Sequence, residues 1–202
     1  RLRTGKQTSY EEDVHVPLLA RGPGIPAGEQ RAGLAGNVDL APTFAGIAGI
    51  DWSGADGRSL LPLLAQAALP EGWRGGYLLQ NWEIGGEDSE AEAALLPAAV
   101  FSGSVLEPPD SVWLDNPFAP LVKLNLPQYR GLRTADYTYV EYQTGEIELY
   151  DLRSDPAQLQ NLAKSADPAL LQALAEWLAR LSACKGMTCR EADQLPVSLP
   201  AP

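Results

Sequence analysis

The chain has 202 residues, of which 45% are hydrophobic and 20% are charged, so it carries enough apolar material to bury a core. Its formal net charge of −11, from 15 Lys and Arg against 26 Asp and Glu, argues against a nucleic-acid-binding protein, which needs clustered cations to neutralise phosphates. No apolar run approaches the roughly 20 residues that a membrane-spanning helix requires.

The first elements are predicted between residues 14 and 49. A short apolar run with β-branched valines at 14–20 is typical of a strand. A helix is expected after it, with Asp39 placed to cap its start and Gly49 placed to close its end. The apolar positions of this helix recur at helical spacing: Leu40, Phe44 and Ile47.

Most of the elements predicted between residues 77 and 151 are strands. Residues 77–82 read as a strand, and the Gly-, Pro-, Ala- and acid-rich stretch at 83–127 reads as a long irregular insertion. Three short runs rich in Tyr, Val, Ile and Thr follow, separated by turn formers, at 129–134, 137–142 and 146–151. Such closely spaced runs predict an antiparallel meander.

A helix at 168–182 is predicted to pack on this meander. Asp167 is placed to cap it, and Pro168 stands at the first helical position, where proline is favoured. The helix carries one apolar stripe: Leu170, Leu171, Leu174, Trp177, Leu178 and Leu181. We expect no regular structure after Cys189, because prolines recur in the last residues.

The two cysteines, Cys184 and Cys189, are separated by four residues. A zinc site would need two more ligands, and a redox pair usually has two intervening residues. A small structural disulfide across the turn at Gly186 fits this spacing best, and two free thiols remain the alternative. The disulfide would indicate an oxidising compartment.

Several motifs, in this order, resemble the later part of sulfatases of the alkaline-phosphatase-like superfamily. They are Gly-Lys-Gln-Thr-Ser-Tyr-Glu-Glu-Asp at 5–13, Val-Pro-Leu-Leu at 16–19 followed by Arg-Gly-Pro-Gly at 21–24, Asn-Val-Asp-Leu-Ala-Pro-Thr at 37–43, Asp-Gly-Arg-Ser-Leu-Leu-Pro at 56–62, and Glu-Leu-Tyr-Asp-Leu at 148–152. Within this family, the cysteine-containing tail makes the chain most similar to N-acetylglucosamine-6-sulfatases and bacterial arylsulfatases.

The resemblance implies an α/β fold, the C-terminal part of an alkaline-phosphatase-like sulfatase fold with a small antiparallel sheet plus helix subdomain. Residues 1–74 would end the large catalytic domain, and residues 75–202 would form the C-terminal subdomain. The meander at 129–151, the helix at 168–182 and the insertion at 83–127 would belong to that subdomain. The family implies a secreted, periplasmic or lysosome-like location.

The resemblance also implies a calcium-dependent hydrolase of sulfated sugars or aryl sulfate esters, with a formylglycine nucleophile made from a Cys/Ser-x-Pro-Ser-Arg motif. That motif is absent from this sequence, and the calcium ligands are expected upstream. Because the only methionine is Met187, we expect the chain to begin inside a longer protein or after processing. We therefore expect this chain alone to be inactive, to bind no calcium, and to expose Leu40, Phe44 and Ile47 until its N-terminal half is supplied.

Lys6 is the one catalytic residue that the resemblance assigns to this chain. In the family, a Gly-Lys before the Tyr-Glu pair supplies a cation to the substrate sulfate, and a fixed ammonium stabilises charge that grows on the leaving oxygen. The alternative for Lys6 is a solvated surface lysine. His15 is the only histidine, and we expect it to point outward without a catalytic role.

Other side chains have structural explanations that compete with functional ones. The acidic run at 11–13 is typical of a solvated turn or a helix start. The tyrosines at 137, 139 and 142 fit half-buried packing in a meander. Trp82 and Trp113 are better candidates for sugar stacking, although packing explains them as well. Two rival functions stay open: a non-catalytic glycan-binding or structural module, and a phosphonate monoester or phosphodiester hydrolase.

Overall fold

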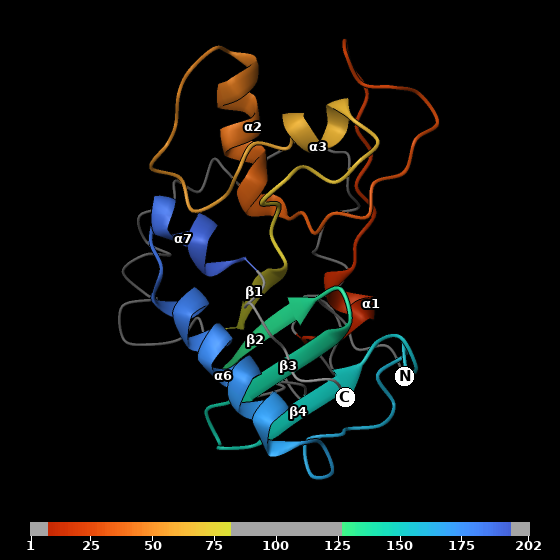
Figure 1. Cartoon of the computed structure of the whole chain (residues 1–202), viewed down its shortest axis with the longest axis vertical. Helices are drawn as coiled ribbons and strands as arrows, with labels where there is room; N and C mark the ends of the chain where they lie inside the picture. The colour runs from red at the N-terminus through yellow and green to blue at the C-terminus, as the bar shows by residue number, and fades with distance from the viewer. Residues whose placement is uncertain (1–7, 82–126, 195–202) are drawn as a thin grey trace, which may run out of the picture. The chain divides into compact units, whose positions relative to one another are not determined.

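The structure, a computed structural model, describes residues 8–81 and 127–194 (Figure 1). The chain divides into two compact units, one made of residues 1–81 and 129–202 and the other of residues 82–128. Apart from residues 127 and 128, the described residues all belong to the first unit. Almost all of the predicted insertion at 83–127 and the end of the predicted irregular tail therefore lie outside the described residues.

The first unit contains a four-stranded antiparallel sheet. Its strands are β1 (Gly76–Asn81), β2 (Tyr129–Thr134), β3 (Tyr137–Tyr142) and β4 (Ile147–Asp151), and they pair in the order β1-β2-β3-β4. The meander predicted for the last three strands and the strand predicted at 77–82 are both confirmed. The turn between β3 and β4 contains Gly145, whose φ of 89° favours glycine.

The helix α6 (Pro168–Ala183) covers one face of this sheet (Figure 1). Asp167 caps it as predicted, since its Oδ1 accepts a hydrogen bond from the Ala169 amide at 2.9 Å. The core between helix and sheet consists of Leu132, Tyr137, Tyr139, Leu149, Leu170, Leu174, Trp177, Leu178 and Leu181. Burial of each large apolar side chain here contributes about 1.5–3 kcal/mol.

The short helix α7 (Met187–Ala192) corrects the prediction that regular structure ends at Cys189. A disulfide between Cys184 and Cys189 ties the start of α7 to the end of α6. The indole Nε1 of Trp177 also donates a hydrogen bond to the Ala192 carbonyl at 2.8 Å. These two contacts stabilise α7, and the spacing of apolar residues in the sequence does not predict either of them.

The N-terminal part contains α1 (Glu11–Val14), the 3₁₀ turn η1 (Asn37–Asp39), α2 (Leu40–Ile47) and α3 (Leu61–Ala65). The predicted helix at 39–47 is confirmed. The predicted strand at 14–20 is wrong, because Val14 ends α1 and the following residues pair with no described strand. Val16, Leu18 and Leu19 are exposed instead, so the apolar run lacks the neighbour that would make it a strand.

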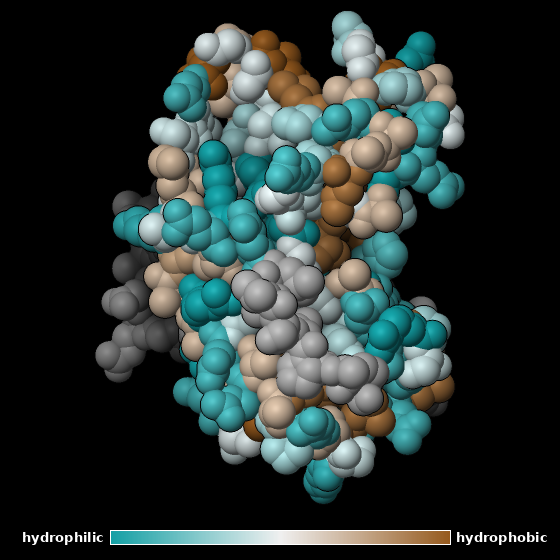
Figure 2. Space-filling view, viewed as in Figure 1, coloured by the Kyte–Doolittle hydropathy of each residue, from teal (hydrophilic) through white to brown (hydrophobic). Residues whose placement is uncertain are grey.

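Apolar side chains also lie on the surface of α2 and of the residues after it. Phe44 is 63% exposed and Ile47 is 66% exposed. Ile50 and Trp52, which follow α2, are exposed apolar residues as well. Figure 2 shows this hydrophobic colouring over α2. Leu40 differs from the expectation, because it packs on a small core of Leu60, Leu63 and Trp73. No helix of the described residues is long and apolar enough to cross a membrane.

Candidate functional site

Residues 8–15 follow the predicted sulfate-binding Lys6, which itself lies outside the described residues. This segment contains α1 and lies on the face of the sheet opposite α6. Side chains alternate along a strand, so Arg133 and Glu148 point away from the core side chains Leu132 and Leu149. Contacts from both residues to the segment show that it covers this second face.

Side chains of the sheet and of its following loop hold the segment. Arg133 donates from Nε and Nη2 to the two carboxylate oxygens of Glu11, at 2.6 and 3.1 Å. Gln158 accepts a hydrogen bond from the Glu11 amide at 2.7 Å. Glu148 accepts one from the hydroxyl of Tyr10 at 3.2 Å. The segment is therefore fixed by side chains that come more than 100 residues later in the chain.

The start of the segment is fixed by a local turn. The Asp13 carboxylate accepts hydrogen bonds from the amide and the hydroxyl of Thr8, the first at 2.9 Å. Ser9, between Thr8 and α1, is completely buried. These hydrogen bonds hold the backbone of Thr8 close to α1.

Glu11 is the carboxylate of this segment that pairs with Arg133. Burial would raise the pKa of its carboxyl, but the hydrogen bonds and charge of Arg133, with a smaller effect of His15, hold that pKa below its usual value. His15 Nδ1 lies 3.1 Å from Glu11, and its side chain is 75% exposed, so it points outward as expected. The acidic run does begin a helix, as predicted, yet Glu11 is an ion-pair partner rather than a solvated side chain.

Tyrosine hydroxyls and one carboxylate complete the polar face of the sheet. Glu148 accepts hydrogen bonds from both Tyr10 and Tyr142, at 3.2 and 3.1 Å. Burial, together with the charge of Asp13, raises the pKa of Tyr129 to about 12, and burial also raises the pKa of Tyr142. These phenols stay neutral near pH 7, so they serve as hydrogen-bond donors and packing surface rather than as bases.

A charge cluster joins η1, the residues before β1 and the end of α7. Its members are the buried Asp39, Arg74 and Asp193 and the partly buried Arg58. Arg74 donates to both oxygens of Asp39, from Nη1 at 2.8 Å and from Nη2 at 2.6 Å. The same carboxylate accepts hydrogen bonds from the amides of Gly36 and Arg58, each at 2.9 Å. Asp39 therefore does not cap α2 with its side chain, which corrects the sequence prediction.

Asp193 extends this charge cluster to the C-terminal end of α7. Its carboxylate lies within 2.6 Å of Arg58 Nη2 and 3.3 Å from Arg74 Nε. Burial raises the pKa of Asp193 and lowers the pKa of Arg58, against the attraction between them. Because each carboxylate in the charge cluster faces guanidinium groups, the cluster is a structural connection and offers no free base or metal ligand.

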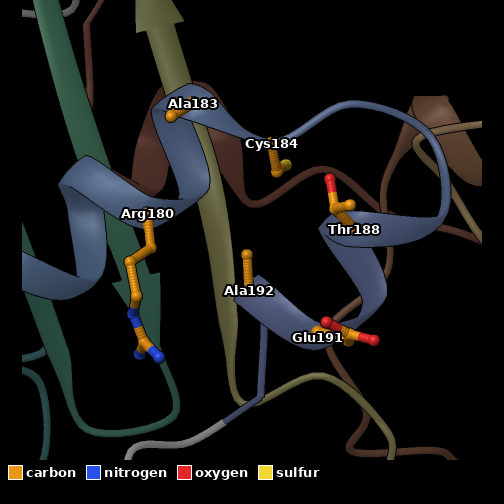
Figure 3. A pocket seen from close by; sticks show the side chains of 6 residues that line it. All are labelled: Arg180, Ala183, Cys184, Thr188, Glu191 and Ala192. Atoms are coloured by element: carbon orange, nitrogen blue, oxygen red, sulfur yellow. The ribbon is translucent and has the colours of Figure 1, made fainter.

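The disulfide lies beside an open hollow of about 360 Å³ at the junction of α6 and α7. Figure 3 shows its lining side chains: Arg180, Ala183, Cys184, Thr188, Glu191 and Ala192. The Thr188 hydroxyl donates to the Lys185 carbonyl at 3.0 Å, and Cys184 is oxidised, so neither is a nucleophile. The predicted disulfide is confirmed, and its role is to hold α7 in place.

The remaining candidates have structural roles or lie elsewhere. Tyr137 and Tyr139 belong to the core under α6, which confirms packing as their role. Trp82 and Trp113 lie outside the described residues. Within residues 8–81 and 127–194, no group of three or more His, Cys, Asp or Glu side chains is placed to hold a metal ion.

Sequence reasoning missed Arg133, Arg74 and Asp193. One signal pointed to Arg133: it is next to Leu132 in a strand, so a buried Leu132 places the guanidinium on the opposite face. Nothing in the sequence pairs Arg133 with Glu11, which is 122 residues away. Arg58 and Asp193 are 135 residues apart, so local sequence patterns do not predict their ion pair either.

The chain is similar in sequence to a family model and to several curated proteins. The family model described as "N-sulphoglucosamine sulphohydrolase, C-terminal" matches residues 4–93. The N-acetylglucosamine-6-sulfatase of Homo sapiens is 36% identical over 190 residues, which cover 92% of this chain and 33% of that protein. An arylsulfatase of Chlamydomonas reinhardtii is 32% identical over 212 residues, covering 94% of this chain and 28% of that protein. The chain thus spans about a third of the length of these curated relatives.

Two solved structures show the fold. A protein in complex with its substrate D-glucosamine-2-N,6-O-disulfate aligns with a TM-score of 0.55 at 24% identity, covering 84% of this chain and 27% of that one. A phosphonate monoester hydrolase from Silicibacter pomeroyi aligns with a TM-score of 0.57 at 24% identity, covering 91% of this chain and 32% of that one. Both place the chain in the α/β, alkaline-phosphatase-like fold that the sequence predicts.

Proposed function

Because this chain belongs to the sulfatase family, we propose that it is the C-terminal part of a sulfuric ester hydrolase that acts on a sulfated sugar or an aryl sulfate. The observation that carries this proposal is the 36% identity with N-acetylglucosamine-6-sulfatase over 92% of the chain. Residues 1–74 would complete the large catalytic domain, and residues 75–202 would form the subdomain that borders the substrate cleft. The disulfide supports a secreted, periplasmic or lysosome-like location.

We assign sulfate binding to Lys6. A sulfate monoester is an anion, and its leaving oxygen gains negative charge in the transition state, so an ammonium held close to it stabilises that state more than the ground state. The fixed segment at 8–15 supports this role, because a catalytic cation is effective only when its position is preorganised. Calcium, when bound, would supply further positive charge, and its ligands would come from outside the described residues.

The test uses the intact protein that contains this chain. We expect it to hydrolyse para-nitrophenyl sulfate and N-acetylglucosamine-6-sulfate, and we expect Lys6→Ala to lower kcat/KM by about 100-fold, the range for loss of one transition-state donor. Lys164→Ala is the matched control, since Lys164 is exposed in the loop before α6. We expect the isolated chain of 202 residues to show no turnover.

The rival functions give different outcomes. Preferential hydrolysis of a phosphonate monoester would assign the protein to the sister class of enzymes. Binding of sulfated glycans without turnover would support a non-catalytic module. Equal activity of the Lys6→Ala and Lys164→Ala variants would remove the sulfate-binding role from Lys6 and leave the reaction class to be decided by substrate preference.

A further inference from the structure

We propose that Arg133 is a positioning residue for Lys6: by binding Glu11, it fixes the segment through which the sulfate-binding lysine is oriented. This inference rests on the proposed function of Lys6. It assigns to the C-terminal sheet a task beyond bordering the cleft, namely to hold the backbone that carries a catalytic cation. Arg133 and Glu148 of the sheet and Gln158 of the loop after it form hydrogen bonds to the segment, and the ring of Tyr150 packs edge-on against that of Tyr10.

The geometry of the Arg133 contact is suited to positioning. Two parallel hydrogen bonds join the guanidinium fork to both oxygens of Glu11, at 2.6 and 3.1 Å, and fix orientation as well as distance. Both side chains are only 18% exposed, so water competes weakly with the pair. A lysine at this position would act as a point charge and would not reproduce the fork.

Arg133 acts on the segment and does not contact the substrate directly. Its charge is neutralised by Glu11, and its remaining nitrogen Nη1 is buried and makes no hydrogen bond within the described residues. A guanidinium in this state is not available to an anion that arrives from solvent. Its effect on the reaction must therefore pass through Glu11 and the backbone of residues 8–14.

Gln158 adds an independent constraint on the same turn of α1. It is the one described non-glycine residue with positive φ, at 52°, and its side chain is buried. Such a backbone conformation costs free energy and persists where surrounding contacts determine it. Here the main-chain amide of Gln158 donates to the Asp155 carbonyl at 3.1 Å. Its side-chain Oε1 accepts a hydrogen bond from the main-chain amide of Glu11. Arg133 of β2 thus holds the side chain of Glu11, and Gln158, in the loop after β4, holds its main-chain amide.

The experiment compares Arg133→Gln with Arg130→Gln in the intact protein. Arg130 is the matched control, because it lies on the same strand and forms a more exposed ion pair with Glu141 at 3.0 Å, away from the segment. We expect Arg133→Gln to lower kcat/KM for para-nitrophenyl sulfate by about 10- to 100-fold, the cost of a catalytic group misplaced by about 1 Å. Arg133→Lys should retain intermediate activity, and Arg130→Gln should stay close to wild type.

Amide hydrogen exchange locates the effect. Arg133→Gln should speed exchange in residues 8–14 while the amides of α6 keep their wild-type protection. If exchange rises throughout the sheet and α6, Arg133 is a general stability residue and the inference is wrong. Unchanged exchange in residues 8–14 would also overturn it.

A double-mutant cycle separates this inference from the proposed function. If Arg133 acts through Lys6, then Arg133→Gln should lower kcat/KM much less in the Lys6→Ala background than in wild type, because the group it positions is gone. Full additivity of the two losses would refute positioning while leaving the sulfate-binding role of Lys6 intact. A fully active Lys6→Ala variant would refute the sulfate-binding role and the inference together.

Discussion

Arg74 and Asp39 form a buried ion pair in which both carboxylate oxygens accept from the guanidinium, at 2.8 and 2.6 Å, with side chains 3% and 0% exposed. Arg74 precedes β1, whereas Asp39 ends η1 in the N-terminal part of the chain. The pair therefore connects the N-terminal helices to the sheet. Asp193 adds the end of α7 to the same connection through Arg58.

Asp39→Asn should destabilise the protein by about 3 kcal/mol or more, because it leaves the buried Arg74 without its main counter-charge. Urea unfolding of the intact protein would measure the change. Glu29→Gln is the control, since Glu29 forms a half-exposed pair with Arg31 and its loss should cost less than about 1 kcal/mol. Equal costs for the two variants would show that burial of the Asp39 pair has no energetic consequence.

The elements that the sequence predicted correctly are those with strong local patterns. The meander follows from β-rich runs separated by turn formers, and α6 follows from its apolar stripe and the cap at Asp167. The prediction was wrong at 14–20, where an apolar run has the composition of a strand but no described strand beside it. Composition indicates whether a segment favours the β conformation. Whether it becomes a strand of a sheet also depends on neighbouring strands that are distant in sequence.

Removal of the disulfide by Cys184→Ser together with Cys189→Ser should lower the free energy of unfolding by about 2 kcal/mol, the entropic value for so short a closed loop. The amide of Gly186, inside that loop, also binds the Asp56 carboxylate, so amide exchange should rise around residue 56 as well. A reductant should reproduce the effect in the wild type and change nothing in the double variant. Wild-type stability of the double variant would show that the packing of α7 alone is sufficient.

Acid should weaken the contact between Glu11 and Arg133. The pKa of Glu11 is lowered in the folded protein, so its contribution to stability is complete above its unfolded pKa of about 4.3 and is lost as the pH falls through the folded value. The difference in melting temperature between wild type and Glu11→Gln should thus be fully present at about pH 5 and shrink as the pH falls further. A difference that grows as the pH falls below about 5 would contradict the assigned direction.

The candidate site was less predictable than the fold. Family motifs indicated Lys6 and the neighbouring Tyr10-Glu11 pair, yet no sequence feature showed that Glu11 binds Arg133 or that Asp39 binds Arg74. Asp39 before a helix reads as a cap, because caps are the common use of aspartate at that place. Its actual partners come from segments that only tertiary structure brings together.

The exposed face of α2 predicts how the isolated chain behaves. Phe44 and Ile47 are more than 60% exposed, and the chain spans only about a third of its curated relatives, so an apolar face of this kind fits a surface that the rest of a longer protein covers. We expect the 202-residue chain alone to self-associate in size-exclusion chromatography with light scattering. Phe44→Gln together with Ile47→Gln should reduce that association, whereas Leu159→Gln, at a more exposed site outside α2, should not. A monodisperse chain with a cooperative melting transition would show that the α2 face is tolerated in water, and the covering surface would then have to be sought elsewhere.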